Sequence, residues 1–407
     1  MNEKLSEAIE KNQADQAFSL LQQMMETTGS ALGDVEFALL DKALSDCLTE
    51  TQILDFHAQW GMVLKRTSYS QRYLGLIVQY KGLEFSDESR NVVVGRNGYL
   101  YLAGGRQSVL DYITGRKSPS PESYDNFREN LKRRNNYCAS RNIKFQHIIF
   151  PDKQSVEVDS FPLESYRCLG DQYVEKCMDL HHALMYPRKE LGAGAFHKKD
   201  THMSDVGYCR LTAHLLKRLD FSEDVCSDIQ QELITCLSKS IKYSGDLGSK
   251  MIPEEFDVKN DIVPGWNFYH VKNNLGVSND GLAELYINNS SLTGMRVVIF
   301  GDSFSRLHSL FLSRCFKEVA FFRTRFFHED VVEMAKPDLV ITGNAERYLS
   351  SVVDDALAPN FFLYPLLKGI GHAPDQDYAI AMNAFLSYGK PNYARFKEQV
   401  RSGKFLS

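Results

Sequence analysis

The spacing of apolar residues changes sharply between Met295 and Arg306. The apolar run Val297 to Phe300 has the length of a buried strand and stops at Gly301-Asp302-Ser303. From Phe304 to Phe316 the apolar residues recur at helical spacing instead. The pattern therefore predicts a strand that turns directly into a helix, with Ser303 at the junction. The alternative is a plain turn in which Asp302 or Ser303 caps the helix.

The same alternation continues on both sides of this segment. Buried strands are expected over Phe145–Phe150, Val319–Arg323 and Leu339–Thr342, and helices over Tyr124–Ser140 and Glu329–Ala335. Strands and helices that alternate at this spacing predict a parallel, doubly wound sheet. The fold class is therefore α/β, with a sheet between two layers of helices.

The first 88 residues carry a helical pattern of their own. Helices are expected from Leu5 to Met24 and over Val35–Leu48, Glu50–Leu64 and Ser70–Lys81. We interpret residues 1–88 as an all-α module for docking or packing, and residues 89–407 as a second domain. Asn97-Gly98 lies between two apolar runs near the start of that domain and predicts a hairpin.

Further helices are expected later in the second domain. They cover Cys168–Met185, a segment from Ser204 or Asp205 to Leu219, and Glu223–Lys242, and the tail Tyr378–Ser407 is expected to be mostly helical. The rest of residues 221–290 has a mixed pattern, which indicates loops and short strands.

Composition and charge exclude several classes of function. The chain has 407 residues and a formal net charge of −5, so nothing favours binding to nucleic acid or to an anionic membrane. Its eight cysteines include no CxxC pair, so we expect reduced thiols and no metal site. The N-terminal sequence lacks the apolar core of a signal peptide, and no run is long enough to span a bilayer. We therefore expect a cytoplasmic protein.

Three residues suggest nucleophilic chemistry. A serine hydroxyl becomes a nucleophile when a base, usually a histidine oriented by an acid, takes its proton. Asp200-Thr201-His202 offers such a base and acid in an aperiodic segment. Ser303 would be the nucleophile, His202 the base and Asp200 the orienting acid. The alternative for Asp200 and His202 is an ordinary surface loop or helix cap.

A further group could stabilise the negative oxygen of a tetrahedral intermediate. Asn344 follows a predicted strand, and its amide could donate to that oxygen together with the Ser303 N–H. Arg323 and Thr324 are less secure contributors. The alternative for Gly343-Asn344 is a simple turn. Because the carboxyl ends of parallel strands share one edge, we expect these groups to converge there.

These segments resemble a known superfamily. Gly301-Asp302-Ser303-Phe304 is similar to the first block of the SGNH hydrolases, and Pro337 to Asn344 to their block with the oxyanion asparagine. The order, with Asp200-Thr201-His202 before the serine, resembles the branch that O-acetylates alginate and related bacterial polysaccharides. Three further landmarks match that branch in order: Gly95 to Leu102, Phe150 to Lys153, and Glu346 to Leu349. Met203 and Tyr99 stand where the branch usually has Trp.

The resemblance implies an SGNH-like domain that transfers an acyl group, acetyl first, to a carbohydrate hydroxyl through an acyl-serine. It implies a carbohydrate or polysaccharide acceptor and an acyl donor, with no bound cofactor. Branch members are typically periplasmic and receive acyl groups from a membrane partner. For a cytoplasmic version the candidates are acetyl-CoA as donor and a nucleotide sugar or growing glycan as acceptor. The alternatives are a carbohydrate acetyl esterase and a non-catalytic glycan-binding scaffold, and the helical module is a candidate site for a protein partner.

Overall fold

The structure is a computed structural model, and it describes residues 1–64, 67, 84–85, 91–163, 166–251, 253–275, 279–370 and 374–388. The chain divides into two compact units. Unit 1 comprises Met1–Arg106, Asp159–Ser165 and Ser244–Phe256, and unit 2 comprises Gln107–Val158, Tyr166–Tyr243 and Asp257–Ser407. Unit 1 therefore extends past residue 88 and includes two segments from later in the chain.

The described part of unit 1 begins with four helices. They are α1 (Asn2–Glu10), α2 (Ala14–Thr28), α3 (Asp34–Asp46) and α4 (Glu50–Leu64). Their apolar faces share one buried cluster that includes Leu21, Phe37 and Phe56. The helix expected over Ser70–Lys81 lies outside the described residues.

A small antiparallel sheet completes the description of unit 1. Its strands, in order, are β1 (Glu84–Phe85), β2 (Val92–Val94) and β3 (Leu100–Leu102). Asn97 and Gly98 turn the chain between β2 and β3 with φ of 57° and 76°, a region that Asn and Gly tolerate. The predicted hairpin is confirmed. Because β1 lies before residue 88, that segment is not helical throughout.

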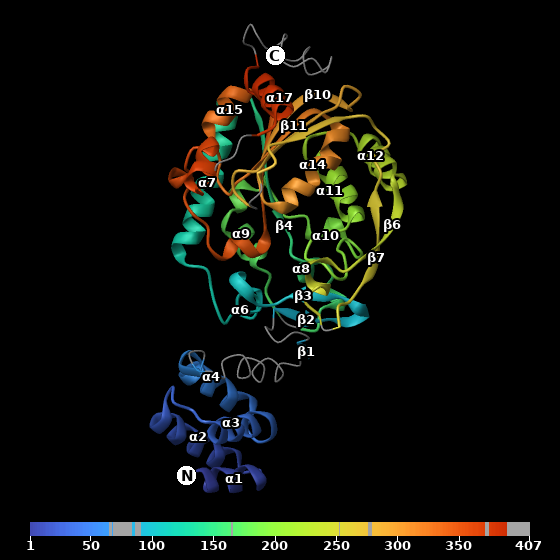
Figure 1. Cartoon of the computed structure of the whole chain (residues 1–407). Helices are drawn as coiled ribbons and strands as arrows, with labels where there is room; N and C mark the ends of the chain where they lie inside the picture. The colour runs from blue at the N-terminus through green and yellow to red at the C-terminus, as the bar shows by residue number, and fades with distance from the viewer. Residues whose placement is uncertain are drawn as a thin grey trace. The chain divides into compact units, whose positions relative to one another are not determined.

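Unit 2 is built on a seven-stranded sheet with the order β5-β4-β12-β10-β11-β9-β8. Figure 1 labels three of these strands, β4, β10 and β11. The strands are β4 (Lys144–Phe150), β5 (Leu184–Met185), β8 (Tyr269–Lys272), β9 (Ala283–Ile287), β10 (Thr293–Gly301), β11 (Phe316–Arg323) and β12 (Leu339–Ala345). Neighbouring strands from β5 to β11 run parallel, and β9 is antiparallel to both of its neighbours. The predicted α/β sheet is confirmed as mostly parallel.

Helices flank both faces of this sheet. Along β10, Val297 and Ile299 belong to one buried cluster, whereas Val298 and Phe300 belong to the other, as the alternation of a strand requires. The first face is covered by α11 (Asp205–Arg218), α12 (Glu223–Thr235) and α14 (Ser303–Cys315). The second is covered by α7 (Pro121–Ala139), α9 (Leu169–Lys176), α15 (Glu329–Ala335) and α17 (Gln376–Leu386). The result is three layers.

Capping residues fix where these helices begin. The Ser120 side chain accepts a hydrogen bond from the Ser123 N–H, and Pro121 occupies the first position of α7. The Ser204 side chain accepts from the Gly207 N–H in the same way at the start of α11. Both helices therefore start within three residues of the positions expected from the sequence.

Two expected helices are shorter than the sequence pattern indicates. In the segment Glu223–Lys242, α12 ends at Thr235, and the chain then forms β6 (Leu237–Tyr243), antiparallel to β7 (Asp257–Ile262). In the segment Cys168–Met185, α9 ends at Lys176, and the last two residues form β5. Pairing with another strand outweighs local helical preference in both places.

Short elements connect these layers. They are α6 (Val109–Ile113), α8 (Lys153–Val156), α10 (Arg188–Leu191) and α16 (Tyr364–Leu367) in unit 2, and α13 (Gly245–Gly248) in unit 1. The expected C-terminal helix is present as α17, and residues 389–407 lie outside the described part. Among the described helices, none combines the length and apolar character needed to cross a bilayer.

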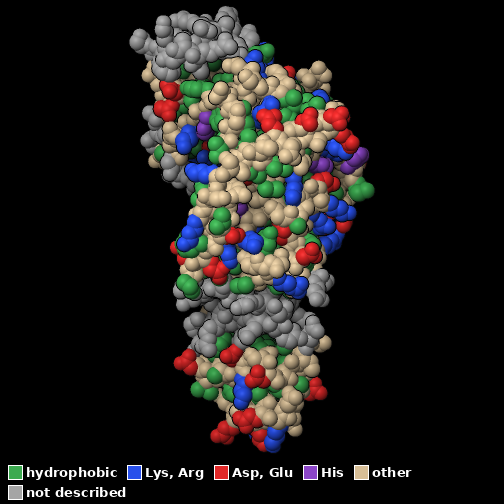
Figure 2. All heavy atoms as spheres, turned by 90° about the vertical axis from the view of Figure 1, so that its right-hand side faces the viewer, with side chains coloured by type: hydrophobic (Ala, Val, Ile, Leu, Met, Phe, Trp, Pro, Cys, Tyr) green, Lys and Arg blue, Asp and Glu red, His purple; other side chains and the backbone are tan. Residues whose placement is uncertain are grey.

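Lys and Arg are interspersed with Asp and Glu over the face drawn in Figure 2.

Two glycines let α14 approach the sheet at the end of β10. Gly301 on β10 pairs with Gly343 on β12. A Cβ at Gly301 would lie 2.1 Å from Ser305 Oγ and 2.8 Å from the Gly343 carbonyl oxygen. The first turn of α14 is therefore seated directly on the sheet, and its position fixes that of Ser303.

We expect Gly301→Ala to lower the free energy of unfolding by about 1–3 kcal/mol, because the added methyl group overfills this contact. Gly294→Ala is the matched control, since it lies on the same strand and a Cβ there would meet nothing within 4 Å. Urea denaturation of both variants checks the prediction. Equal stability of the two proteins would contradict the close contact.

Candidate active site

Ser303 lies where the sequence pattern placed it, at the junction of β10 and α14. It is the first residue of α14, so its backbone N–H has no acceptor within the helix. Asp302 caps the helix, with Oδ1 accepting from the Phe304 N–H at 2.9 Å. The serine hydroxyl thus sits at the positive end of a helix, where developing negative charge is stabilised.

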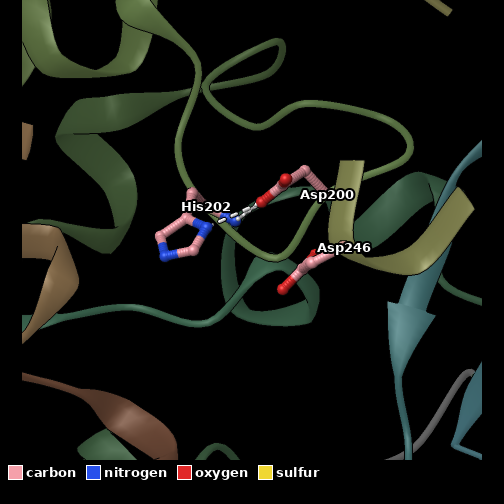
Figure 3. Close-up of side chains that lie close together, drawn as sticks. All are labelled: Asp200, His202 and Asp246. Atoms are coloured by element: carbon pink, nitrogen blue, oxygen red, sulfur yellow. Dashed lines mark hydrogen bonds and ion pairs between the residues drawn. The ribbon is translucent and has the colours of Figure 1, made fainter. Parts of the chain in front are cut away.

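The structure brings His202 and Asp200 to this serine although they lie far from it in sequence. His202 Nε2 is 2.9 Å from Ser303 Oγ, and His202 Nδ1 is 2.7 Å from Asp200 Oδ1. Figure 3 shows the Asp200 carboxylate directed at the His202 ring. Asp246, also drawn there, belongs to unit 1. Asp200 is 4% exposed, while the His202 side chain keeps 26% of its surface, so the imidazole can be reached from outside.

The loop that carries Asp200 and His202 is closed on itself. The Ser204 N–H donates to the Ala195 carbonyl oxygen at 2.8 Å, and Phe196 and Met203 form an isolated bridge. Glu157 is buried and accepts from the Phe196 N–H at 3.1 Å. Met203 is buried in the core and anchors the loop. These contacts hold in place the loop that carries His202.

One carboxylate joins the nucleophile to the candidate oxyanion residue. While Oδ1 of Asp302 caps α14, its Oδ2 accepts from the Ala345 N–H at 2.7 Å. The residue before Ser303 therefore holds the residue after Asn344. The Asn344 side chain is partly exposed, and its Nδ2 lies 3.0 Å from the Ala345 carbonyl oxygen.

Arg323 and Thr324 do not offer backbone donors to an oxyanion. The Arg323 N–H donates to the Leu282 carbonyl oxygen at 2.7 Å, and the Thr324 N–H donates to the Gly301 carbonyl oxygen at 3.1 Å. The Thr324 hydroxyl is buried within 3.1 Å of His328 Nε2. The backbone N–H groups of both residues therefore have acceptors already, and the oxyanion role expected for the Ser303 N–H and Asn344 stays a prediction.

Two of the sequence landmarks meet in a buried charged cluster next to the site. Asp152 forms an ion pair with Arg347, and both side chains are buried. Glu346 accepts from the Asp152 N–H at 2.9 Å and from Ser155 Oγ at 2.6 Å. Burial raises the pKa of Glu346 to about 7, and the Asp152 carboxylate adds to the rise. The Arg347 guanidinium also lies 5.1 Å from the centre of the Phe304 ring, which joins the cluster to α14.

Sequence reasoning missed one residue that touches the site. Tyr243, the last residue of β6, donates its hydroxyl to Asp200 Oδ2. It falls at the end of a segment expected to be helical, although Leu237, Ile241 and Tyr243 follow the two-residue spacing of a strand. That spacing was the available signal.

Within the described part of unit 2, no three His, Cys, Asp or Glu side chains gather closely enough to hold a metal ion.

No protein-family model matches this chain, and no curated protein matches it by sequence. It is similar to the solved structure of Bacillus cereus PatB1 with a sulfonyl adduct, at 10% identity and a TM-score of 0.44, over 63% of this chain and 94% of that one. The O-acetyltransferase domain of Pseudomonas putida AlgJ gives 13% identity and 0.42, over 69% and 99%. Pseudomonas aeruginosa AlgX gives 9% and 0.35, over 74% and 67%. Scores below 0.5 identify no activity, so the function must be inferred from the residues themselves.

We expect Arg347→Met to lower the free energy of unfolding by about 3–5 kcal/mol, because it leaves the buried Asp152 charge without its partner. Arg167→Met is the control: it breaks the ion pair with Glu175, in which both side chains are more than half exposed, and should leave stability nearly unchanged. Chemical denaturation of the two variants measures the difference. A similarly small loss of stability in both variants would contradict strong coupling between Asp152 and Arg347.

Proposed function

We propose that this protein transfers an acyl group, acetyl first, to a carbohydrate hydroxyl through an acyl-serine intermediate on Ser303. The observation that carries the proposal is the unbroken hydrogen-bonded sequence from Asp200 through His202 to Ser303. This arrangement of acid, imidazole and hydroxyl, with the hydroxyl at a helix N-terminus, suits acyl transfer. The carbohydrate acceptor is favoured by the resemblance of six sequence landmarks to polysaccharide O-acetyltransferases.

The first half of the reaction would form the acyl-serine. Ser303 Oγ attacks the carbonyl carbon of the donor while its proton passes to His202 Nε2. The carbonyl oxygen becomes negative, and in this proposal the Ser303 N–H and the Asn344 amide would donate hydrogen bonds to it. Asp200 stabilises the imidazolium that forms. His202 then gives the proton to the leaving group as the bond from the carbonyl carbon to that group breaks.

The second half would release the acyl group to the acceptor. A sugar hydroxyl gives its proton to His202 Nε2 and attacks the acyl-serine, and the returning proton restores the Ser303 hydroxyl. Water in place of the sugar would make the protein a carbohydrate acetyl esterase. The partial exposure of His202 favours keeping this alternative, because water can reach an imidazole that keeps 26% of its side-chain surface exposed.

The donor and the protein partner are further parts of the proposal. Acetyl-CoA is the donor to test first for a cytoplasmic enzyme. The helices α1 to α4 have their own apolar cluster, which suits a module that binds another protein. A non-catalytic glycan-binding scaffold is the remaining alternative.

We expect Ser303→Ala to reduce release of chromophore from an acetyl ester by at least about a thousandfold, because it removes the hydroxyl that lies against His202 Nε2. Mass spectrometry of the wild-type protein should find the acetyl group on the peptide that contains Ser303. Ser309→Ala, on the same helix and buried against the backbone, is the control and should retain activity. Acetyl on an added glycan would identify a transferase, and free acetate alone an esterase. Turnover that persists in Ser303→Ala would refute the mechanism, and the absence of any turnover or labelling in the wild type would favour the scaffold.

We expect Asp302→Ala to lower turnover about tenfold to a hundredfold, because it releases Ser303 and the Asn344 strand end from each other. It also removes a helix cap, which costs about 1 kcal/mol of stability. Asp375→Ala is the control, because the Asp375 carboxylate caps α17 in the same way and accepts from the Tyr378 N–H at 2.9 Å. Comparing the two variants separates the loss of a helix cap from the loss of the link to Asn344. Both variants should lose similar stability in denaturation experiments, but only the first should lose turnover. Equal turnover in both would argue against the linking role of Asp302.

A further inference from the structure

The hydroxyl of Tyr243 contacts the oxygen of Asp200 that His202 leaves unused. His202 reaches Oδ1 with both its ring Nδ1, at 2.7 Å, and its backbone N–H, at 2.8 Å. The Tyr243 hydroxyl donates to Oδ2. Because Asp200 is buried, each donor to its carboxylate offsets part of the desolvation cost of that charge.

We propose that Tyr243 is a positioning residue for acyl transfer: its hydroxyl fixes the Asp200 carboxylate so that Oδ1 stays on His202. The proposal rests on the proposed function of Ser303. A carboxylate can rotate about its last side-chain bond, and the two contacts of His202 involve one oxygen only. A donor on the opposite oxygen restrains that rotation and shares part of the negative charge.

The Tyr243 ring is itself held from two sides. Tyr243 pairs with Asp257 at the base of the β6–β7 hairpin. The Lys259 ammonium group, on β7, lies 4.4 Å from the ring centre and pairs with Asp261 at 2.7 Å. The His197 ring meets the tyrosine ring edge to face, with centres 5.6 Å apart. A ring fixed in this way can hold its hydroxyl at one point on the carboxylate.

The same hairpin also holds the chain on the other side of His202. The Ile262 N–H, at the end of β7, donates to Asp205 Oδ2 at 2.6 Å. Asp205 is the first residue of α11 and follows His202 by three positions. The hairpin therefore contacts the catalytic loop both before and after the imidazole. Of these two contacts, only that of Tyr243 reaches a group in the proposed triad.

The charges around the tyrosine favour its role as a donor. The Lys259 cation lies over the ring and makes the phenol a stronger hydrogen-bond donor. Burial lowers the pKa of His197 to about 4, so this neighbour is neutral near pH 7. The other charged groups that act on His197 are Asp200, Lys153 and Asp261. Loss of the hydroxyl would remove one donor from the Asp200 carboxylate and with it a restraint on the rotation of that carboxylate.

The test is Tyr243→Phe, assayed with the chromogenic acetyl ester. We expect kcat to fall about tenfold to a hundredfold, the range of one charge-assisted hydrogen bond, with KM changed less than about twofold. Tyr208→Phe is the matched control, since its hydroxyl is buried without a partner among the described residues. It should change neither quantity.

A second variant separates positioning from general stability. If Tyr243 acts through Asp200, then Tyr243→Phe should cost less than about twofold when it is added to Asp200→Asn. A full second loss in that double variant overturns the proposal. An equal loss of kcat in Tyr243→Phe and Tyr208→Phe also overturns it.

Proton NMR of the whole protein gives a readout that needs no turnover. The proton between His202 Nδ1 and Asp200 should give a downfield signal that moves in Tyr243→Phe, while circular dichroism stays unchanged. If the wild type shows no turnover that depends on Ser303, the proposed function fails, and this signal still decides the role of Tyr243. A signal at the same position in wild type and Tyr243→Phe overturns that role whatever the activity.

Discussion

The proposed chemistry depends on one hydrogen bond between segments that are distant in sequence. His202 Nε2 and Ser303 Oγ, 101 positions apart, lie 2.9 Å from each other. A proton can pass between them only within that distance, so each side of the contact needs its own rigid support. The sheet supports the serine, through β10 and the closely seated α14. A closed loop supports the histidine, through backbone contacts to its neighbours and through the hairpin that carries Tyr243.

The buried charges near the site have a related role. Asp302 satisfies donors on two elements at once, and Asp152, Glu346 and Arg347 connect the ends of β4 and β12 with α14. Buried ionised groups are costly unless each has its partners, so such a cluster tolerates few arrangements. This explains in physical terms why the Pro-Asp-Lys and Glu-Arg segments accompany the serine and asparagine segments in the sequence. They hold the edge of the sheet on which the reacting groups lie.

The sequence predicted the central part of unit 2 well, because its strands are short apolar runs followed by glycine. The strands of Val297–Phe300 and Leu339–Thr342 and the position of Ser303 followed from that pattern alone. The strands β5 and β6 did not follow from the sequence pattern. Each comes after a helix and forms because it pairs with another strand. The acid–base loop was located by residue type and by resemblance, not by periodicity. No local pattern could show that Tyr243 reaches Asp200, because that contact joins segments 43 positions apart.

Ser303 is supported by the sheet and His202 by a loop, and this difference affects how the protein would lose activity on heating. Ser303 directly follows the buried strand β10, whereas His202 lies in a connecting loop. Regions of this second kind open locally at lower free energy than the core. Heating or mild denaturant would therefore misalign the imidazole while the sheet remains intact. Inactivation would precede melting, and would reverse on cooling.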